Sequence, residues 1–410
     1  GQHGYDVAGA NLEIEKRKVV GSWNELTIEK EYDTGTDATD ALKKSLTADS
    51  IRTSGLIAGD DAKVDPSSLT TVNAQFADAN AGYGKSLTVS GVIKFTGADA
   101  ENYSDIDANG LTPPSTGLTG NIRQKKIVVG LDTAKDYKKT YDGTANVKST
   151  VDPKTTNDVL QLTAKNAGGY ATGDVKLNYT DIKAKYMKDK SSDADANASG
   201  NAKVNRDIAY KNIKLAAGAT GSTANYMLVN DAGDVLYREK AAGEDAYKAA
   251  HATDYASLTN DANKSTNDRY IGAVKTDGAT IWGKGTIEKR KIDASAFTVE
   301  GTPKVYDGTD YLVVGGTGRK VQGTVDTAAG TATDTGKNVI EADKNKLKFT
   351  ISAADNKAYY KNSATSATTT KDVYDATTNP MGARVLSYTL KASDTTNGET
   401  LANYELDYSS

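Results

Sequence analysis

Histidine and cysteine, which carry much of the nucleophilic and metal chemistry of proteins, are nearly missing from this sequence. Its 410 residues include no cysteine and two histidines, His3 and His251. The sequence therefore offers no thiolate nucleophile, disulfide framework or cysteine metal site, and two histidines are too few for a histidine zinc site. No Gly-x-Ser-x-Gly nucleophile elbow lies near His251. We expect no enzyme activity and no cofactor.

Two acidic segments carry oxygen ligands at the alternating spacing of a calcium-binding loop. Residues 193–199 read Asp-Ala-Asp-Ala-Asn-Ala-Ser, and a weaker case surrounds Asp60 and Asp61. An EF-hand loop needs glycine at its sixth position and a bidentate glutamate at its twelfth. In the first segment these positions hold Ala198 and Val204. We therefore predict a solvated loop there, with bound calcium as the alternative.

Tyrosine-aspartate turns recur three times and could bind a sugar through an aromatic ring and a carboxylate. They are Tyr32-Asp33-Thr34-Gly35, Tyr141-Asp142-Gly143-Thr144 and Tyr306-Asp307-Gly308-Thr309. A structural interpretation explains the same residues, because aspartate caps a turn through its side chain, glycine supplies a positive φ and tyrosine packs its ring beneath. Since such a turn stands in every repeat, we interpret all three as architecture. The ligand-binding residues stay unknown.

Each turn belongs to a larger repeated unit. A strand-forming stretch with a basic cluster precedes the turn, at 12–20, 121–129 and 286–292. The unit closes on an Asn-Tyr pair, and these pairs are Asn102-Tyr103, Asn225-Tyr226 and Asn403-Tyr404. Landmarks that recur in a fixed order indicate repeated domains. We predict a tail of a preceding unit, or an artificial remnant, at 1–11, then module 1 at 12–121, module 2 at 122–285 with an insertion at about 230–284, and module 3 at 286–410.

Composition and turn frequency indicate slender β modules. The sequence has 23 Tyr and 4 Phe, and tyrosine suits positions between an apolar interior and water. Short runs of alternating polarity, such as 386–390, are typical of half-buried strands, whereas helical patterns are few, at 39–51 and 243–258. We predict a mainly β protein of three tandem antiparallel β modules in an elongated array. Each module is expected to be sandwich-like, with a β-grasp as the alternative.

The insertion at about 230–284 breaks the repeat, so specialised binding is expected there first. Trp282, Tyr270 and Arg269 lie near its end. If exposed, these three side chains would resemble a binding hot spot. We interpret Trp282 instead as a packing anchor at the module boundary.

The order of the landmarks resembles the YDG and MBG repeat domains, which occur in tandem in large bacterial surface proteins of the filamentous-haemagglutinin type. Module 1 is most similar, through Ile-Glu-Lys-Arg at 14–17, Asp-Ala-Asn-Ala-Gly at 78–82 and its closing pair. It departs at Thr34, which reads as a residue inserted before the glycine. Modules 2 and 3 keep the Tyr-Asp-Gly-Thr turn and the Ala-Asn-Tyr closure. Module 2 shows no clear counterpart of the Asn-Ala-Gly turn.

The resemblance implies an extracellular segment of a bacterial cell-surface adhesin, whose repeats form a stalk and bring no catalytic residues. Its partners would be host or matrix glycans or proteins, or copies of itself. One alternative is a self-assembling filament or biofilm matrix component that pairs strand edges. A second is a polysaccharide-active enzyme, since the 54 acidic residues allow many carboxylate pairs. That enzyme would need a deep aromatic cleft, and Trp23 and Trp282 are isolated.

Charge and hydropathy argue against two classes of partner. The chain has 50 basic and 54 acidic residues and a net charge of −4. It therefore lacks the clustered basic excess that nucleic-acid binding normally needs. No apolar run approaches the roughly 18–20 residues of a membrane span.

Overall fold

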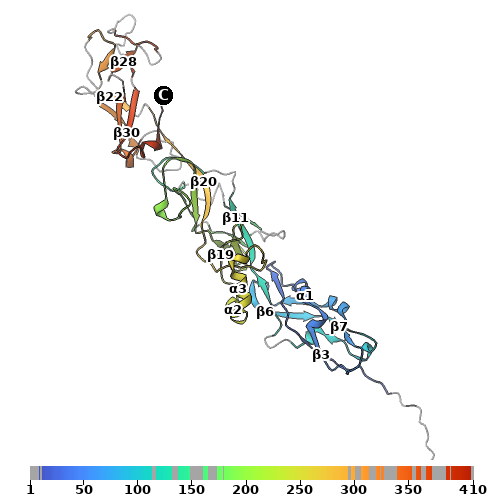
Figure 1. Ribbon diagram of the computed structural model, residues 1–410. Coiled ribbons are helices and arrows are strands. Elements are labelled where there is room, and N and C mark those ends of the chain that lie inside the picture. The colour runs from blue at the N-terminus through green and yellow to red at the C-terminus, as the bar shows by residue number, and fades with distance from the viewer. Residues whose placement is uncertain are drawn as a thin grey trace, which may run out of the picture. The chain divides into compact units, whose positions relative to one another are not determined.

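The computed structural model divides into two compact units (Figure 1). It describes residues 9, 12–112, 117–131, 137–147, 160–164, 173–178, 180–293, 297–300, 306–313, 320–323, 325–326, 339–352, 357–361, 366–371, 385–387 and 389–407. The predicted tail at 1–11 lies almost entirely outside these ranges. Unit 1 contains Gly1–Gly130, Gln161–Asp181 and Ile213–Ala279, and unit 2 contains Leu131–Leu160, Ile182–Asn212 and Thr280–Ser410.

Short strands dominate both units. Those of unit 1 are β1 (Val20–Trp23), β2 (Glu29–Glu31), β3 (Ile51–Ser54), β4 (Lys63–Val64), β5 (Asn73–Phe76), β6 (Gly82–Ser90), β7 (Val92–Ile93), β8 (Phe95–Thr96), β9 (Ile106–Asp107), β10 (Thr119–Arg123), β11 (Lys125–Leu131), β13 (Leu160–Ala164), β14 (Val175–Leu177), β17 (Leu215–Ala217), β18 (Tyr226–Val229) and β19 (Val235–Arg238). Its α-helices are α1 (Thr39–Ser45), α2 (Glu244–Ala250) and α3 (Ala252–Thr259).

The described part of unit 2 consists of strands and short turns. The strands are β12 (Tyr137–Thr140), β15 (Lys183–Tyr186), β16 (Lys203–Lys211), β20 (Ile281–Glu288), β21 (Arg290–Asp293), β22 (Phe297–Glu300), β23 (Tyr311–Val313), β24 (Lys320–Gly323), β25 (Val325–Asp326), β26 (Val339–Ile340), β27 (Leu347–Ser352), β28 (Lys357–Lys361), β29 (Val385–Ser387), β30 (Thr389–Asp394) and β31 (Tyr404–Asp407).

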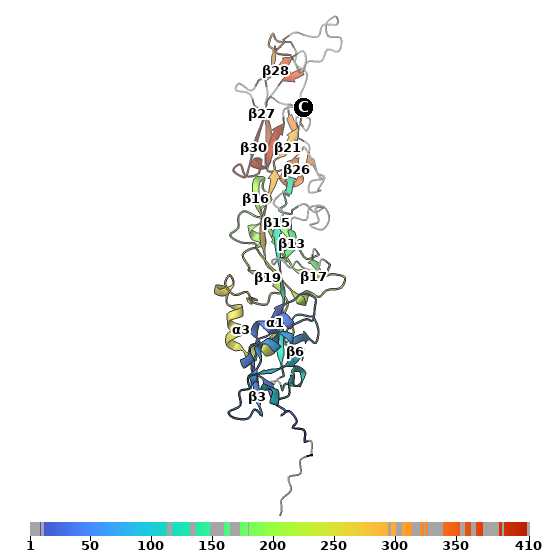
Figure 2. The same ribbon diagram turned by 90° about the vertical axis from the view of Figure 1, so that its right-hand side faces the viewer.

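The same four-stranded sheet occurs once in each unit. Its strand order is β2-β10-β6-β5 in unit 1 and β12-β20-β16-β15 in unit 2. Figure 2 labels β6 of the first sheet and β15 and β16 of the second. In both sheets the first pair is parallel and the other two pairs are antiparallel. β6 and β16, which occupy the same position, are both 9 residues long. In unit 1, α1 packs beside β2 and β5 with Ala41 and Leu42 buried.

A parallel strand pair ties the two ends of each module together. β11 pairs with β18, and β21 pairs with β31. In module 1 the equivalent contact is a single parallel bridge between Arg17 and Tyr103. In each case a basic residue of the opening stretch aligns with the closing tyrosine, as Lys125 does with Tyr226.

The prediction of a mainly β protein is confirmed. The predicted antiparallel pairing holds for most of the described strand pairs but not for all of them. The described strands include five parallel pairs, which are β2/β10, β11/β18, β12/β20, β21/β31 and β25/β26. A parallel pair needs a long crossover connection, and the body of a module provides one between its opening and closing strands. Periodicity shows which face of a strand is buried, but it does not show which partner the strand pairs with. The sandwich, the β-grasp and the elongated array stay predictions.

Two consecutive strands connect each module to the next. β10 and β11 are separated only by Gln124, and β20 and β21 only by Lys289. The Gln124 side-chain amide donates hydrogen bonds to the backbone oxygens of Ala224 and Glu239, both at 2.9 Å. The recurring basic stretch is therefore the crossing point between modules. The predicted limits of the three modules stay a prediction, because each compact unit combines parts of two modules.

Tyrosine rings fill much of the core. Tyr103, Tyr186, Tyr210 and Tyr226 are among the largest fully buried side chains. The sequence suggested half-exposed positions for tyrosine, and the rings lie deeper than that. Burial is tolerated where the hydroxyl finds a partner inside, as Tyr226 does on Asp174 at 2.6 Å.

Candidate functional site

The three Tyr-Asp turns share one hydrogen-bond pattern. In each turn the aspartate carboxylate accepts a hydrogen bond from the backbone N–H two residues later. The distances are 2.9 Å for Asp33 and Gly35, 2.8 Å for Asp142 and Thr144, and 2.9 Å for Asp307 and Thr309. This is the side-chain cap of a tight turn, and it leaves the carboxylate occupied within its own turn.

Thr34 occupies the glycine position of the first turn. Its φ is +72°, close to the +79° of Gly143 and the +77° of Gly308. The interpretation of Thr34 as an inserted residue is therefore wrong. Module 1 keeps the length of the turn and exchanges the order of glycine and threonine, so a branched side chain adopts the left-handed conformation.

A lysine three residues before the aspartate holds the first two turns. Lys30 Nζ lies 2.8 Å from Asp33 Oδ1, and Lys139 Nζ lies 2.9 Å from Asp142 Oδ1. Burial lowers the pKa of Lys139, although its contact with Asp142 opposes that shift. Sequence reasoning missed these lysines. The recurring Lys-x-Tyr-Asp spacing, which is also present at 304–307, is the signal that could have found them.

In unit 1 the turn tyrosine of module 1 meets the closing tyrosine of module 2. The rings of Tyr32 and Tyr226 lie edge to face with centroids 5.3 Å apart. Both hydroxyls point to one carboxylate, Asp174, at 3.5 Å from Tyr32 and 2.6 Å from Tyr226. Edge-to-face geometry is a preferred arrangement of aromatic pairs.

Unit 2 builds the same arrangement from modules 2 and 3. The rings of Tyr141 and Tyr404 also lie edge to face, with centroids 5.4 Å apart. Their hydroxyls donate to Asp343 at 2.9 Å and 2.8 Å. The geometry is thus repeated with a different aspartate in a different unit.

The asparagine of each closing pair adds a second contact. Asn225 accepts a hydrogen bond from the backbone N–H of Ala81 at 2.8 Å and donates one to the side chain of Asn80 at 3.2 Å. Asn403 makes the same two contacts with Ala202 and Asn201, at 2.7 Å and 3.2 Å. These asparagines are almost completely buried.

Module 2 therefore does have a counterpart of the Asn-Ala-Gly turn. The sequence showed none, but Asn201-Ala202 stands directly before β16 as Asn80-Ala81 stands before β6. The missing glycine obscured the match. An Asn-Ala pair immediately before a long strand was the signal available in the sequence.

We call these two sets of residues the junctions. The first junction comprises Tyr32, Asn80, Ala81, Asp174, Asn225 and Tyr226, and the second comprises Tyr141, Asn201, Ala202, Asp343, Asn403 and Tyr404. Burial raises the pKa of Tyr32, Tyr141 and Tyr404, and the nearby carboxylates add to this shift. Their hydroxyls therefore remain protonated hydrogen-bond donors at neutral pH.

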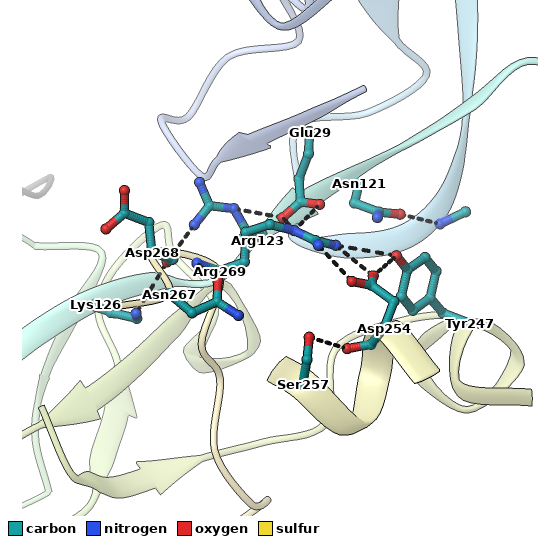
Figure 3. Close-up of polar contacts among 11 residues, drawn as sticks. Glu29, Asn121, Arg123, Lys126, Tyr247, Asp254, Ser257, Asn267, Asp268 and Arg269 are labelled. Carbon is teal, nitrogen blue, oxygen red and sulfur yellow. Dashed lines mark hydrogen bonds and ion pairs between the residues drawn. The ribbon is translucent and has the colours of Figure 1, made fainter. Parts of the chain in front are cut away.

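An arginine network ties the insertion to β2 and β10 of the first sheet (Figure 3). Arg269 lies 2.9 Å from Glu29 Oε2 of β2 and 2.8 Å from Asp254 of α3. Arg123 of β10 forms an ion pair with Glu29 at 2.8 Å and donates to the backbone oxygen of Asp268 at 2.9 Å. Glu29 thus lies between two arginines, one from the sheet of module 1 and one from the insertion.

A buried ion pair stabilises the insertion itself. Arg238 and Glu244 form a double hydrogen bond at 2.9 Å and 2.8 Å, and both are essentially inaccessible to solvent. Tyr255 also donates to Glu244, at 2.8 Å. The segment then contacts β6 through the backbone N–H of Tyr83, which donates to Ala242 O at 2.8 Å. α2 therefore lies beside β6, and α3 packs against α2 (Figure 1).

The suspected hot spot near the end of the insertion is packed. Tyr270 is 3% exposed, and Arg269 is held by two carboxylates. Trp282 is half-buried on β20. His251 is exposed between α2 and α3, with its ring stacked on Tyr247. His3 lies outside the described residues.

The acidic segment at 193–199 uses its oxygen atoms and amides locally. Asp195 pairs with Lys185 at 3.0 Å, and this contact lowers the pKa of Asp195. The side-chain amide of Asn197 donates to the backbone oxygens of Asp189 and Ser192. Within the described ranges, the structure holds no group of three acidic or histidine side chains placed to bind a metal. Bound calcium stays the untested alternative.

An open groove of about 870 Å³ lies along β5, β6, β7 and β9. Amide, hydroxyl and carboxylate side chains line it, including Asn73, Gln75, Thr88, Asp107 and Asn109. These groups offer both donors and acceptors to a polar ligand. Sequence reasoning did not find this groove, because its residues come from four separate strands, β5, β6, β7 and β9, and the turns beside them.

The family model of the YDG domain matches residues 16–109. This range contains the first turn, Asn80-Ala81, the polar groove and the closing pair of module 1. Neither the curated proteins nor the solved structures gave a match. In the described part of the chain, no helix is long and apolar enough to cross a membrane.

Proposed function

We propose that this chain is a structural segment of a bacterial cell-surface adhesin, in which YDG-type modules in series act as a stiff spacer. The observation that carries the proposal is the repetition of the junction. Two tyrosines, one aspartate and an Asn-to-Asn-Ala contact recur in both units with nearly the same distances. A ligand site would not require the same buried contact between each pair of neighbouring modules.

The chemistry of the junction suits a joint that resists bending. Hydrogen bonds to a charged group contribute roughly 1.5–3 kcal/mol, and an aromatic pair about 0.5–1.5 kcal/mol beyond its buried area. Two consecutive strands also connect each module to the next, with only Gln124 or Lys289 between them. This differs from a flexible linker, whose ends move independently.

Contact with carbohydrate is a second candidate function, and the polar groove on β5, β6, β7 and β9 favours it. Its amide and carboxylate groups suit the hydroxyls of a sugar. In this role the spacer would also contribute to adhesion. Glycan-array binding by the full chain tests the idea, with Gln75→Ala and Asn109→Ala as variants and Val204→Ala, at an exposed position outside the groove, as the control.

Small-angle X-ray scattering tests the spacer. A rod of three modules should have a radius of gyration near roughly 35 Å, whereas a compact chain of this length should have about 22 Å. Tyr32→Ala and Tyr141→Ala together should broaden the distribution of interatomic distances, because each removes one ring and one hydroxyl from a junction. Val204→Ala, at an exposed position outside both junctions, is the control. A wild-type value near about 22 Å would reject the spacer.

A further inference from the structure

The third Tyr-Asp turn has the geometry of the other two but an open face. Tyr306 is 57% exposed, whereas Tyr32 is 7% and Tyr141 is 5% exposed. A methyl group added to Gly143 would meet Ile340 Cδ1 at 2.7 Å, while one added to Gly308 would meet nothing within 4 Å. The surface that Ile340 covers in the second junction is therefore accessible at the third turn.

Module 1 contains the complementary half of a junction. Tyr103 donates to Asp60 at 2.5 Å and accepts from the backbone N–H of Ile57 at 3.0 Å. In the second junction, Tyr404 donates to Asp343 at 2.8 Å and accepts from the backbone N–H of Ile340 at 3.2 Å. The spacing between the isoleucine and the aspartate is the same in both.

This half-junction is preformed. Tyr103 is 1% exposed and its ring centroid lies 6.1 Å from that of Phe95, whereas Ile57 and Asn102 face solvent. Ile57 is 51% exposed, although its counterpart Ile340 is 2% exposed. Asn102 is exposed, whereas Asn225 and Asn403 are buried against the Asn-Ala pair of the preceding module. A 3-10 turn precedes the closing tyrosine in all three modules, at Ala100–Asn102, Thr223–Asn225 and Leu401–Asn403. A turn tyrosine that docks on module 1 would cover Ile57 and Asn102, as the occupied junctions cover Ile340, Asn225 and Asn403.

We propose that Tyr306 of one chain docks on Ile57, Asp60, Asn102 and Tyr103 of a second copy and forms a third junction. The two occupied junctions within the chain define the partner, because each pairs a turn tyrosine with an aspartate and a closing Asn-Tyr pair. The second also holds Ile340 at the place that Ile57 takes in module 1. The contact is heterologous, so repeated association produces an open filament rather than a closed dimer. The inference rests on the proposed spacer, which it extends from one chain to a series of chains.

Sedimentation equilibrium over a micromolar-to-millimolar series tests the docking. The mass of the wild-type chain should rise with concentration. Tyr306→Ala alone and Ile57→Asp combined with Asn102→Ala should each hold the mass at one chain, because each removes one half of the contact. Val204→Ala, which changes an exposed valine outside both halves, should associate like the wild type. Circular dichroism should show that all variants are folded.

Mixing the two deficient variants gives the sharpest test. Each retains the half that the other lacks, so an equimolar mixture should form a complex of two chains and grow no further. A mass that stays at one chain at every wild-type concentration would overturn the docking, and so would association that persists in both variants. Neither change touches an occupied junction. A chain that is rigid but stays monomeric would therefore contradict the docking and still agree with the proposed spacer function.

Discussion

Thr34 holds a backbone conformation that branched side chains rarely adopt. Its φ of +72° is left-handed, which costs an L-residue roughly 1–2 kcal/mol. Thr34→Gly should remove this strain and so stabilise the fold. Glycine's greater freedom in the unfolded chain should offset about 0.5–1 kcal/mol of that gain. We expect the urea midpoint of the transition that unfolds unit 1 to rise. Thr53→Gly in β3, where no positive φ occurs, should lower it, and a lower midpoint for Thr34→Gly would show that the turn holds threonine without strain.

Gly143 and Gly308 form a matched pair that separates turn strain from junction packing. Their φ values are +79° and +77°, so alanine at either position should cost a similar roughly 1–2 kcal/mol of backbone strain. Only at Gly143 would the new methyl group press on Ile340, and overpacking adds about 1–3 kcal/mol. Urea unfolding should therefore show a larger loss for Gly143→Ala than for Gly308→Ala. Equal losses would mean that Ile340 does not press on the second turn.

At the residue scale, the sequence identified the aromatic half of each junction but not the carboxylate. Tyr32, Tyr141, Tyr226 and Tyr404 belong to motifs with repeated spacing. The aspartates do not, because the sequence separation between aspartate and closing tyrosine is 43 in module 1, 52 in module 2 and 61 in module 3. Because this sequence separation differs from module to module, the aspartates form no repeated motif that sequence analysis could recognise. Only the folded chain places Asp60, Asp174 and Asp343 in the same role.

At the scale of elements, sequence patterns indicated several strands and both helical segments. The pattern at 243–258 forms α2 and α3, which separate at His251, and the pattern at 39–51 forms α1 followed by a 3-10 turn at Ala48–Ser50. Their contacts could not be predicted, since an amphipathic face does not specify which surface it covers. The insertion, where we expected specialised binding, packs on β6 through α2, and its binding role stays a prediction.

The arginine network shows what that packing contributes. Arg269→Ala removes the contacts to Glu29 and Asp254, although Glu29 keeps Arg123 as a partner. Because Arg269 is about a third exposed, we expect a loss of about 1–2 kcal/mol, between the effects of surface and buried ion pairs. Urea unfolding measures it. Lys240→Ala, which breaks an exposed pair with Asp245, is the control and should cost less than about 0.5 kcal/mol.

The loss from Arg269→Ala should also depend on pH. The hydrogen bond from Arg269 lowers the pKa of Asp254 in the folded state. The pairing therefore stabilises the fold at pH values above about 3.9, the pKa of aspartate in the unfolded chain. The contribution disappears as pH falls through the lower pKa of the folded state. The difference between variant and wild type should therefore shrink below about pH 4. A difference that stays constant in acid would assign the loss to packing alone.

At the scale of the whole molecule, the three modules predicted from sequence and the two compact units of the structure divide the chain differently. Unit 1 joins residues 161–181 and 213–279 of module 2 to module 1. The first junction and the insertion supply the contacts that hold these segments together. A sequence repeat marks where a motif recurs, whereas a compact unit reflects where contacts are dense. The two coincide only when neighbouring modules touch little.

Buried tyrosine hydroxyls make both units sensitive to alkali. Burial raises the pKa of Tyr247 to about 12 and also raises the pKa of Tyr83, Tyr141 and Tyr404. Below the unfolded pKa of about 10, both states keep these protons and stability is unaffected. Above it the unfolded chain ionises first, so each tyrosine removes about 1.4 kcal/mol per pH unit until pH passes its folded pKa. We expect stability to be constant from pH 7 to about 9 and to fall above about 10.

Tyr141→Phe tests whether a junction hydroxyl takes part in this loss. At neutral pH the variant should be less stable by about 1–3 kcal/mol, because the hydrogen bond to Asp343 is gone. Phenylalanine cannot ionise, so the deficit should shrink as pH rises past about 10. Circular dichroism follows unfolding while absorbance at the tyrosinate band follows ionisation. If tyrosines ionise near their ordinary pKa with the fold unchanged, the hydroxyls of the junctions are not buried hydrogen-bond donors, and the stiffness assigned to them loses its physical basis.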